Sequence, residues 1–68
     1  MWTRNINNEL VNLATVEKIF IQTRGTTQTP LFLINARMMS DSIETLAEYR
    51  TKKKADEKLR EISKQLEG

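Results

Sequence analysis

The sequence predicts an α+β fold, in which a three- or four-stranded antiparallel β-meander is packed by one C-terminal α-helix. Two segments rich in β-branched and aromatic residues flank a loop that contains Gly25, the pattern of a hairpin. Near the C-terminus, apolar residues recur at offsets of four, three and four, which is typical of a helix with one buried side. Because 68 residues make one domain at most, we expect residues 1–68 to form a single domain.

The strands that we expect cover, in chain order, residues 8–12, 16–24, 31–39 and 42–49. The first is the weakest, because "NINN" is turn-like, and residues 2–12 are equally compatible with an irregular arm. The second and third, "VEKIFIQTR" and "LFLINARMM", have strand composition. Between them, Gly25 is free to take positive φ, and Pro30 is barred from pairing in mid-sheet. An antiparallel hairpin is the simplest pairing of these two strands.

Both of these strands have apolar residues on two sides. Alternation places Ile19 and Ile21 on one side of the second strand, and Val16 and Phe20 on the other. In the third strand, one side carries Phe32, Ile34, Ala36 and Met38. The opposite side carries Leu31 and Leu33. A sheet with one solvated side shows apolar residues at alternate positions only. We therefore expect something to cover both sides of the hairpin.

The stretch "DSIETLAEYRTKKKADEKLREI", residues 41–62, has two interpretations. As one long helix, it begins with Asp41 as the N-cap and Glu44 as the capping-box acid. As a strand followed by a helix, it places on one strand face Ile43, Thr45, Ala47 and Tyr49. The apolar stripe favours the second interpretation, because it begins only at Ala55. We therefore expect a helix over residues 51–66, capped by Thr51.

Two stretches of the chain resemble a known group of proteins. "ELVNLATVEKIFI" is similar to the opening of small bacterial and phage proteins, in which an "N-L-x-x-V" turn joins two strands. "ETLAEYRTKKKADEKLREI" is similar to their ending, in which a strand closes with an aromatic residue before the helix. The resemblance implies an antiparallel meander with a C-terminal helix and no shared catalytic residues. The chain departs from the pattern at "TKKK", where acidic residues are more usual.

The composition excludes several classes of chemistry. The chain has no Cys and no His, which removes disulfides, thiol nucleophiles, imidazole acid–base catalysis and the usual zinc ligands. The serines have no histidine to activate them, and Gly25 stands alone without a phosphate-binding motif. We expect no enzyme, no cofactor and no metal site. With neither a signal sequence nor about 20 consecutive apolar residues, we also expect a cytoplasmic protein that does not enter membranes.

A run of basic residues is the one feature that hints at an anionic ligand. Arg50, Lys52, Lys53 and Lys54 place four positive charges within five positions at the predicted start of the helix. A helix N-terminus already offers unpaired N–H groups to an anion, so nucleic acid or a nucleotide is one candidate ligand. The simpler interpretation is a solvated first turn. The net charge of +2 also argues against strong non-specific binding of nucleic acid.

Self-association is the stabilising device that remains for so short a chain. Below about 70–80 residues one core rarely supplies more than roughly 3–5 kcal/mol. We expect a homo-oligomer, most simply a dimer, and assign to its interface Trp2, Phe20, Leu31 and Leu33. The sequence thus predicts a non-catalytic interaction or accessory protein of bacterial or phage origin, which binds itself and has a protein partner as a second candidate. The alternative function is binding of an anionic ligand through Lys52–Lys54.

Overall fold

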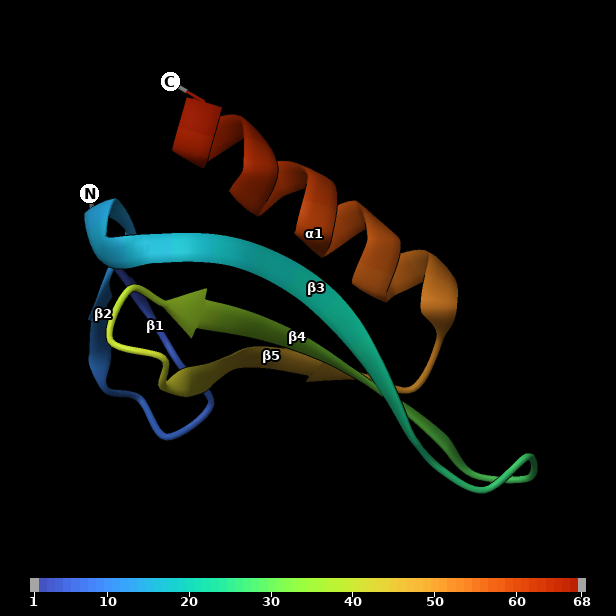
Figure 1. The fold of residues 1–68 in the computed structure, drawn as a ribbon. Coiled ribbons are helices and arrows are strands. Elements are labelled where there is room, and N and C mark those ends of the chain that lie inside the picture. Colours follow the sequence, from blue (N-terminus) through green and yellow to red (C-terminus); the bar gives the residue numbers. More distant parts are fainter. Residues whose placement is uncertain (1, 68) are drawn as a thin grey trace.

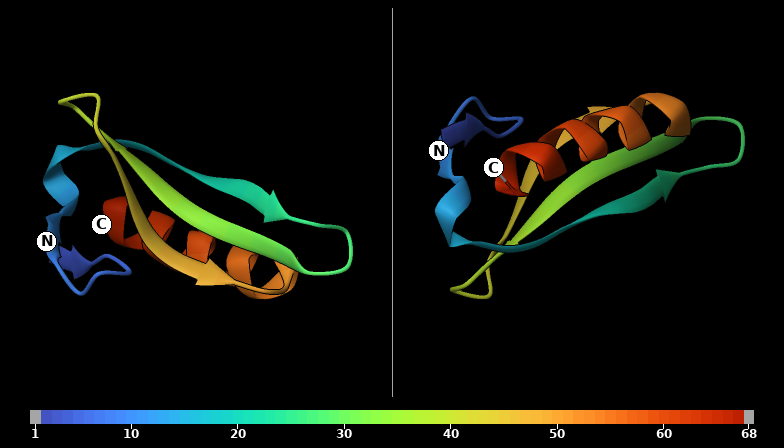
Figure 2. Two further views of the ribbon diagram at one scale, coloured as in Figure 1. Left: turned by 90° about the horizontal axis from the view of Figure 1, so that it is seen from below. Right: turned by 90° about the horizontal axis from the view of Figure 1, so that it is seen from above.

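The computed structural model describes residues 2–67 and confirms the α+β fold class (Figure 1). Three antiparallel strands form a meander in the order β3-β4-β5, with bounds Val16–Gly25, Pro30–Met38 and Ile43–Tyr49. Helix α1 (Lys52–Glu67) lies along one face of this sheet (Figure 2). The segment after Asp41 is therefore a strand followed by a helix, and the long-helix interpretation is excluded.

The N-terminal residues form a separate hairpin instead of a fourth strand of the meander. Strand β1 (Trp2–Arg4) pairs with β2 (Leu10–Asn12) in a two-stranded sheet, and a 3-10 turn, η1 (Leu13–Thr15), leads into β3. The expected strand over residues 8–12 was incomplete, because the "NINN" segment turns the chain between two short strands. Asn8 takes a positive φ of 63° there, a conformation that asparagine tolerates.

Hydrogen bonds of the Asn5 side chain connect this hairpin to the edge of the meander. Its buried side chain accepts hydrogen bonds from the N–H groups of Asn7 and Glu9, each at 2.9 Å. Its Nδ2 donates to the carboxylate of Glu44 on β5 at 3.0 Å. The backbone N–H of Ile6 also donates to the carbonyl oxygen of Thr45 at 3.0 Å. The hairpin therefore partly covers the outer edge of β5, where unpaired backbone groups would otherwise face solvent.

The core lies between the sheet and α1. Ile34 and Ala36 in the middle of β4 are fully buried, and Ile62 of α1 packs in the same cluster. Ala55 is also fully buried on the helix, so the apolar stripe faces the sheet as its spacing predicts from Ala55 to Ile62, whereas its last member, Leu66, is exposed. Val11 reaches the core from β2. The hairpin thus extends the single core beyond the meander.

Two β-bulges change which residues face the core. Ile34 pairs with Ala47 but Asn35 pairs with Thr45, so Leu46 is an extra residue in β5 and joins the core cluster. Ile43 and Thr45 consequently face away from α1, and the predicted common face of Ile43, Thr45, Ala47 and Tyr49 was wrong. A second bulge lies between Val16 and Lys18. It brings Val16 against the core cluster, which corrects the predicted common face of Val16 and Phe20.

Local side-chain chemistry defines the two turns of the meander. Gly25 ends β3 with a φ of +86°, and a Cβ there would collide with the carbonyl oxygen of Thr29. Thr26 closes the same loop, because its Oγ1 accepts the N–H of Thr29 at 3.0 Å. In the second turn, Asp41 takes a φ of 68° and forms a 3.0 Å ion pair with Arg37. Each turn therefore holds its strands in antiparallel register.

Replacing Ile34 by valine tests the position of the core. The substitution removes one methylene group from a side chain that is 0% exposed, so we expect unfolding to require about 0.5–1.5 kcal/mol less free energy. Ile6→Val is the matched control, because Ile6 is 49% exposed, and should change stability by less than about 0.5 kcal/mol. Urea denaturation of both variants measures the difference. Equal losses of stability would contradict the placement of Ile34 at the centre of the core.

Candidate functional site

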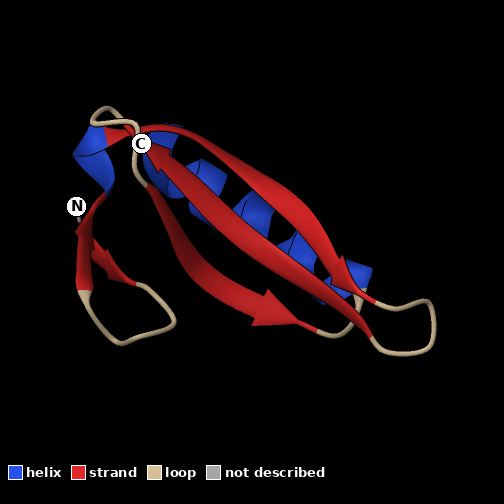
Figure 3. Ribbon diagram, turned by 60° about the horizontal axis from the view of Figure 1, so that its bottom comes forward, coloured by secondary structure: helices blue, strands red, loops and turns tan. Residues whose placement is uncertain are grey.

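The face of the sheet opposite α1, here named the open face, is the main candidate for a binding surface. Strand register assigns to it Lys18, Phe20, Gln22, Arg24, Leu31, Leu33, Asn35, Arg37, Ile43, Thr45 and Glu48. Across residues 2–67, no helix or strand lies over this face, and α1 is seen behind it (Figure 3). One side of the sheet is therefore packed, and the other presents both apolar and polar side chains to solvent.

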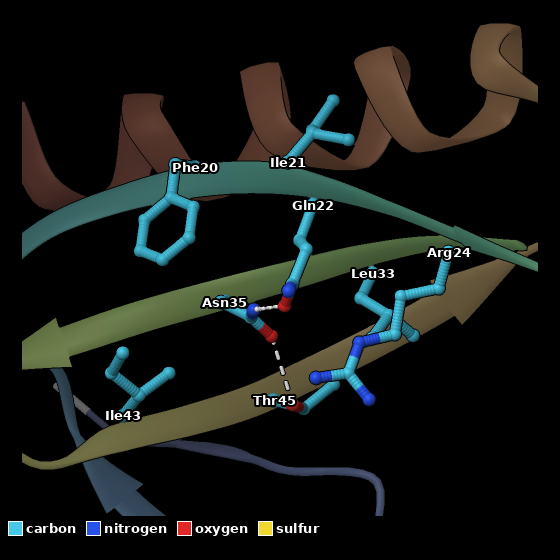
Figure 4. A pocket seen from close by; sticks show the side chains of 8 residues that line it. All are labelled: Phe20, Ile21, Gln22, Arg24, Leu33, Asn35, Ile43 and Thr45. Carbon is cyan, nitrogen blue, oxygen red and sulfur yellow. Dashed lines mark hydrogen bonds between the residues drawn. The ribbon is translucent and has the colours of Figure 1, made fainter.

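A ladder of polar side chains crosses the middle of the open face. Asn35 on β4 donates through Nδ2 to the Oε1 of Gln22 on β3 at 2.8 Å, and its Oδ1 accepts from the hydroxyl of Thr45 on β5 at 2.8 Å (Figure 4). Asn35 is only 3% exposed, although it lies on the face without a cover. Satisfied hydrogen bonds make its burial tolerable. The ladder joins all three strands and leaves the amide nitrogen of Gln22 outside these two bonds.

Apolar side chains surround this ladder and line a shallow hollow of about 540 Å³. Phe20 and Ile43 lie on one side of the ladder, and Leu33 lies on the other side (Figure 4). Ile21 lines the rim, but its side chain points toward α1. Ile43 is 57% exposed, which is high for a large aliphatic side chain on a strand. The open face thus combines partly exposed apolar side chains with hydrogen-bonded polar groups at fixed positions.

Charged residues of the open face differ in whether they have partners. Arg37 is paired with Asp41, and the ammonium group of Lys18 lies 5.6 Å from the centroid of the Phe20 ring. Arg24 and Glu48 are both exposed and carry opposite charges, and in the described part of the chain neither forms an ion pair. The Arg24 side chain extends across the sheet from β3 toward β5 (Figure 4).

The predicted interface residues fall on two different surfaces. Phe20, Leu31 and Leu33 lie together on the open face, as alternation along the strands predicts. Trp2 lies apart from them in the N-terminal hairpin, where it pairs with Asn12 and is 61% exposed. Its hairpin neighbour Leu10 is equally exposed. Three of the four predicted interface residues therefore lie on the open face, and Trp2 lies on the N-terminal hairpin.

Sequence reasoning missed several residues of the open face. Ile43 and Thr45 were assigned to the other side of β5, because the bulge at Leu46 leaves no mark in the alternation of residue types. Gln22 was missed because a glutamine on a strand is usually a solvated residue. One signal was present: Asn35 interrupts the apolar run of β4, and a buried asparagine needs partners on neighbouring strands.

The predicted basic patch surrounds the first turn of α1. Arg50, Lys52, Lys53 and Lys54 are all exposed, and the Oγ1 of Thr51 accepts the Lys54 N–H at 3.4 Å. The shallow hollow beside this turn is lined by Lys52, Lys53, Asp56, Glu57 and Arg60. Acidic and basic groups therefore alternate on this surface, which weakens its field toward an anion.

No family model, curated protein or solved structure matches the chain. Within residues 2–67, no helix combines the length and apolar character that crossing a lipid bilayer requires.

The three lysines of the first helical turn oppose the helix dipole, which leads to a stability prediction. The first turn holds no acidic residue, so changing Lys52, Lys53 and Lys54 together to glutamate should stabilise the fold by about 1 kcal/mol at low salt. Thermal unfolding followed by circular dichroism measures the change. The matched control is Lys64→Glu, because Lys64 is in the last turn, where a cation is favourable. A stabilised control, or a destabilised triple variant, would contradict the electrostatic argument.

Proposed function

We propose that this protein is a small, non-catalytic interaction or accessory protein that acts as a homodimer, with the open face as its contact surface. The observation that carries the proposal is a sheet packed by a helix on one face and bare on the other, with Phe20, Leu31 and Ile43 at least partly exposed on the bare face. Burial of such a face releases water from apolar surface and stabilises association. A chain without His or Cys also lacks the side chains most used in catalysis.

The size of the open face supports a weak dimer. Three strands spaced about 4.8 Å apart, with about eight residues rising about 3.3 Å each, give a footprint of roughly 14 by 26 Å. A standard interface buries about 800 Å² on each partner, so a footprint of roughly 360 Å² is less than half of the standard area and lies below the usual range. Interfaces of this size belong to reversible assemblies, and we expect dissociation constants on the order of micromolar.

The biological setting is part of the same proposal. The resemblance of the two chain segments to small bacterial and phage meander proteins supports a bacterial or phage origin. A composition without cysteine supports a reducing compartment, the cytoplasm. A second protein that binds the outer face of the hairpin, where Trp2 and Leu10 are exposed, would make the dimer an adaptor.

The second candidate function is weak binding of nucleic acid or a nucleotide by the basic patch. The exposure of its four residues at a helix N-terminus supports it, and the neighbouring Asp56 and Glu57 weigh against it. Titration with a short oligonucleotide at low and moderate salt, on the wild type and the triple lysine-to-glutamate variant, tests this function. Salt-sensitive binding that the variant loses would support it, and no binding at low salt would eliminate it.

Ile43→Lys tests whether the open face mediates dimerisation. Because Ile43 is 57% exposed, the variant should fold normally, but a buried lysine in the interface should prevent association. We expect light scattering to give a mass of two chains for the wild type at about one hundred micromolar, and of one chain for the variant. Leu10→Lys is the matched control, because Leu10 is 61% exposed on the hairpin, and it should remain a dimer. A monomeric wild type would refute the proposed function.

A further inference from the structure

We propose that the second copy docks on the open face about a two-fold axis parallel to β4, so that Arg24 of each copy forms an ion pair with Glu48 of the other. This inference rests on the proposed function, and it adds the geometry and the specificity of the dimer. It follows from three observations: the strand register, the positions of the two opposite charges, and the apolar residues that surround the polar ladder.

The register places Arg24 and Glu48 on opposite strands of the same face and close to the same level. Arg24 on β3 is opposite Leu31, and Glu48 on β5 is opposite Leu33. Leu31 and Leu33 are two residues apart on β4, a separation of about 6.6 Å along the strand. The arginine and glutamate are also two strands apart, which is about 10 Å across the sheet. The arginine and glutamate side chains are long enough to bridge the offset of about 6.6 Å along the strand when β3 of one copy lies over β5 of the other.

A two-fold axis parallel to β4 brings these strands face to face. It exchanges the two edges of the sheet and keeps each residue at its own level, so β3 of one copy lies over β5 of the other. Arg24 then meets Glu48 of the partner subunit twice in the dimer, once on each side of the axis. The same operation places Phe20 over Thr45 of the partner subunit and next to its Ile43, while Lys18 lies level with that Ile43. The opposite charges are therefore matched, and Phe20 borders the Ile43 side chain of the partner subunit.

A two-fold axis perpendicular to the strands does not bring the opposite charges together. It places β3 over β3 and β5 over β5, which keeps Arg24 and Glu48 of the partner subunit at opposite edges, about 10 Å apart. Glu48 then approaches its own copy when the axis passes near the level of Leu33. Like charges that face each other disfavour an interface, so charge complementarity selects the axis parallel to β4.

The centre of the proposed interface accounts for the polar ladder. Leu31 and Leu33 on β4 lie next to the axis and meet their own copies. Asn35 also lies near the axis, and the Gln22 amide nitrogen beside it offers donors to the ladder of the second copy. A buried polar group that is satisfied in only one alignment fixes the register of an interface. Arg37, farther along β4, is already neutralised by Asp41 in its own chain.

Charge reversal and mixing of variants test this geometry. In Arg24→Glu, two glutamates face each other on each side of the dimer, and in Glu48→Arg two arginines do. Each variant alone should dimerise about tenfold more weakly at low salt. An equimolar mixture of the two variants should regain wild-type affinity, because every contact in the mixed dimer pairs opposite charges. Sedimentation equilibrium of both single variants, their mixture and the wild type measures the dissociation constants.

The outcomes separate this inference from the proposed function. Dimers of both variants with unchanged affinity would overturn the ion pairs while leaving dimerisation intact. Recovery in the double variant R24E/E48R without recovery in the mixture would assign the pair to a single chain and also overturn the inference. Arg60→Glu, an exposed charge reversal on the helix, should leave the affinity unchanged. A wild type that stays monomeric would instead refute the proposed function itself.

Discussion

Contact between the Ala55–Ile62 stripe of α1 and the centre of β4 is the interaction on which the rest of the structure depends. Ile34 and Ala36 are fully buried, and Leu46 packs in the same core cluster. One helix with one apolar stripe covers one face of a three-stranded sheet and no more. The same contact that stabilises the fold therefore determines which face of the sheet stays open.

The β-bulges decide what that open face contains. If Leu46 were paired in a regular ladder without the bulge, Thr45 would share a face with Ala47, and no third member of the polar ladder would lie beside Asn35. The bulge instead sends Leu46 into the core and turns Ile43 and Thr45 outward. The composition of the open face thus depends on a local irregularity of one edge strand. The neighbouring hairpin supports that strand through the hydrogen bond from Ile6 to Thr45.

The sequence predicted the fold class well, because its signals are periodic and local. The helix stripe that begins at Ala55 and the strand composition around Phe20 and Ile34 each specify an element without reference to distant residues. Faces were predicted only as far as alternation holds, so Phe20, Leu31 and Leu33 were grouped correctly, and Ile43 was not. A bulge and a hairpin from "NINN" depend on tertiary contacts, such as that between Asn5 and Glu44, which no local pattern reports.

The central claim is that one face of the sheet packs on the helix and the other on a second copy of the chain. An isotope-filtered NOE experiment on a mixture of labelled and unlabelled protein tests it most directly, because it detects only contacts between chains. We predict cross-peaks between the ring protons of Phe20 and the methyl groups of Ile43 of the partner subunit. Dimers that show cross-peaks only from Trp2 and Leu10 would contradict the account.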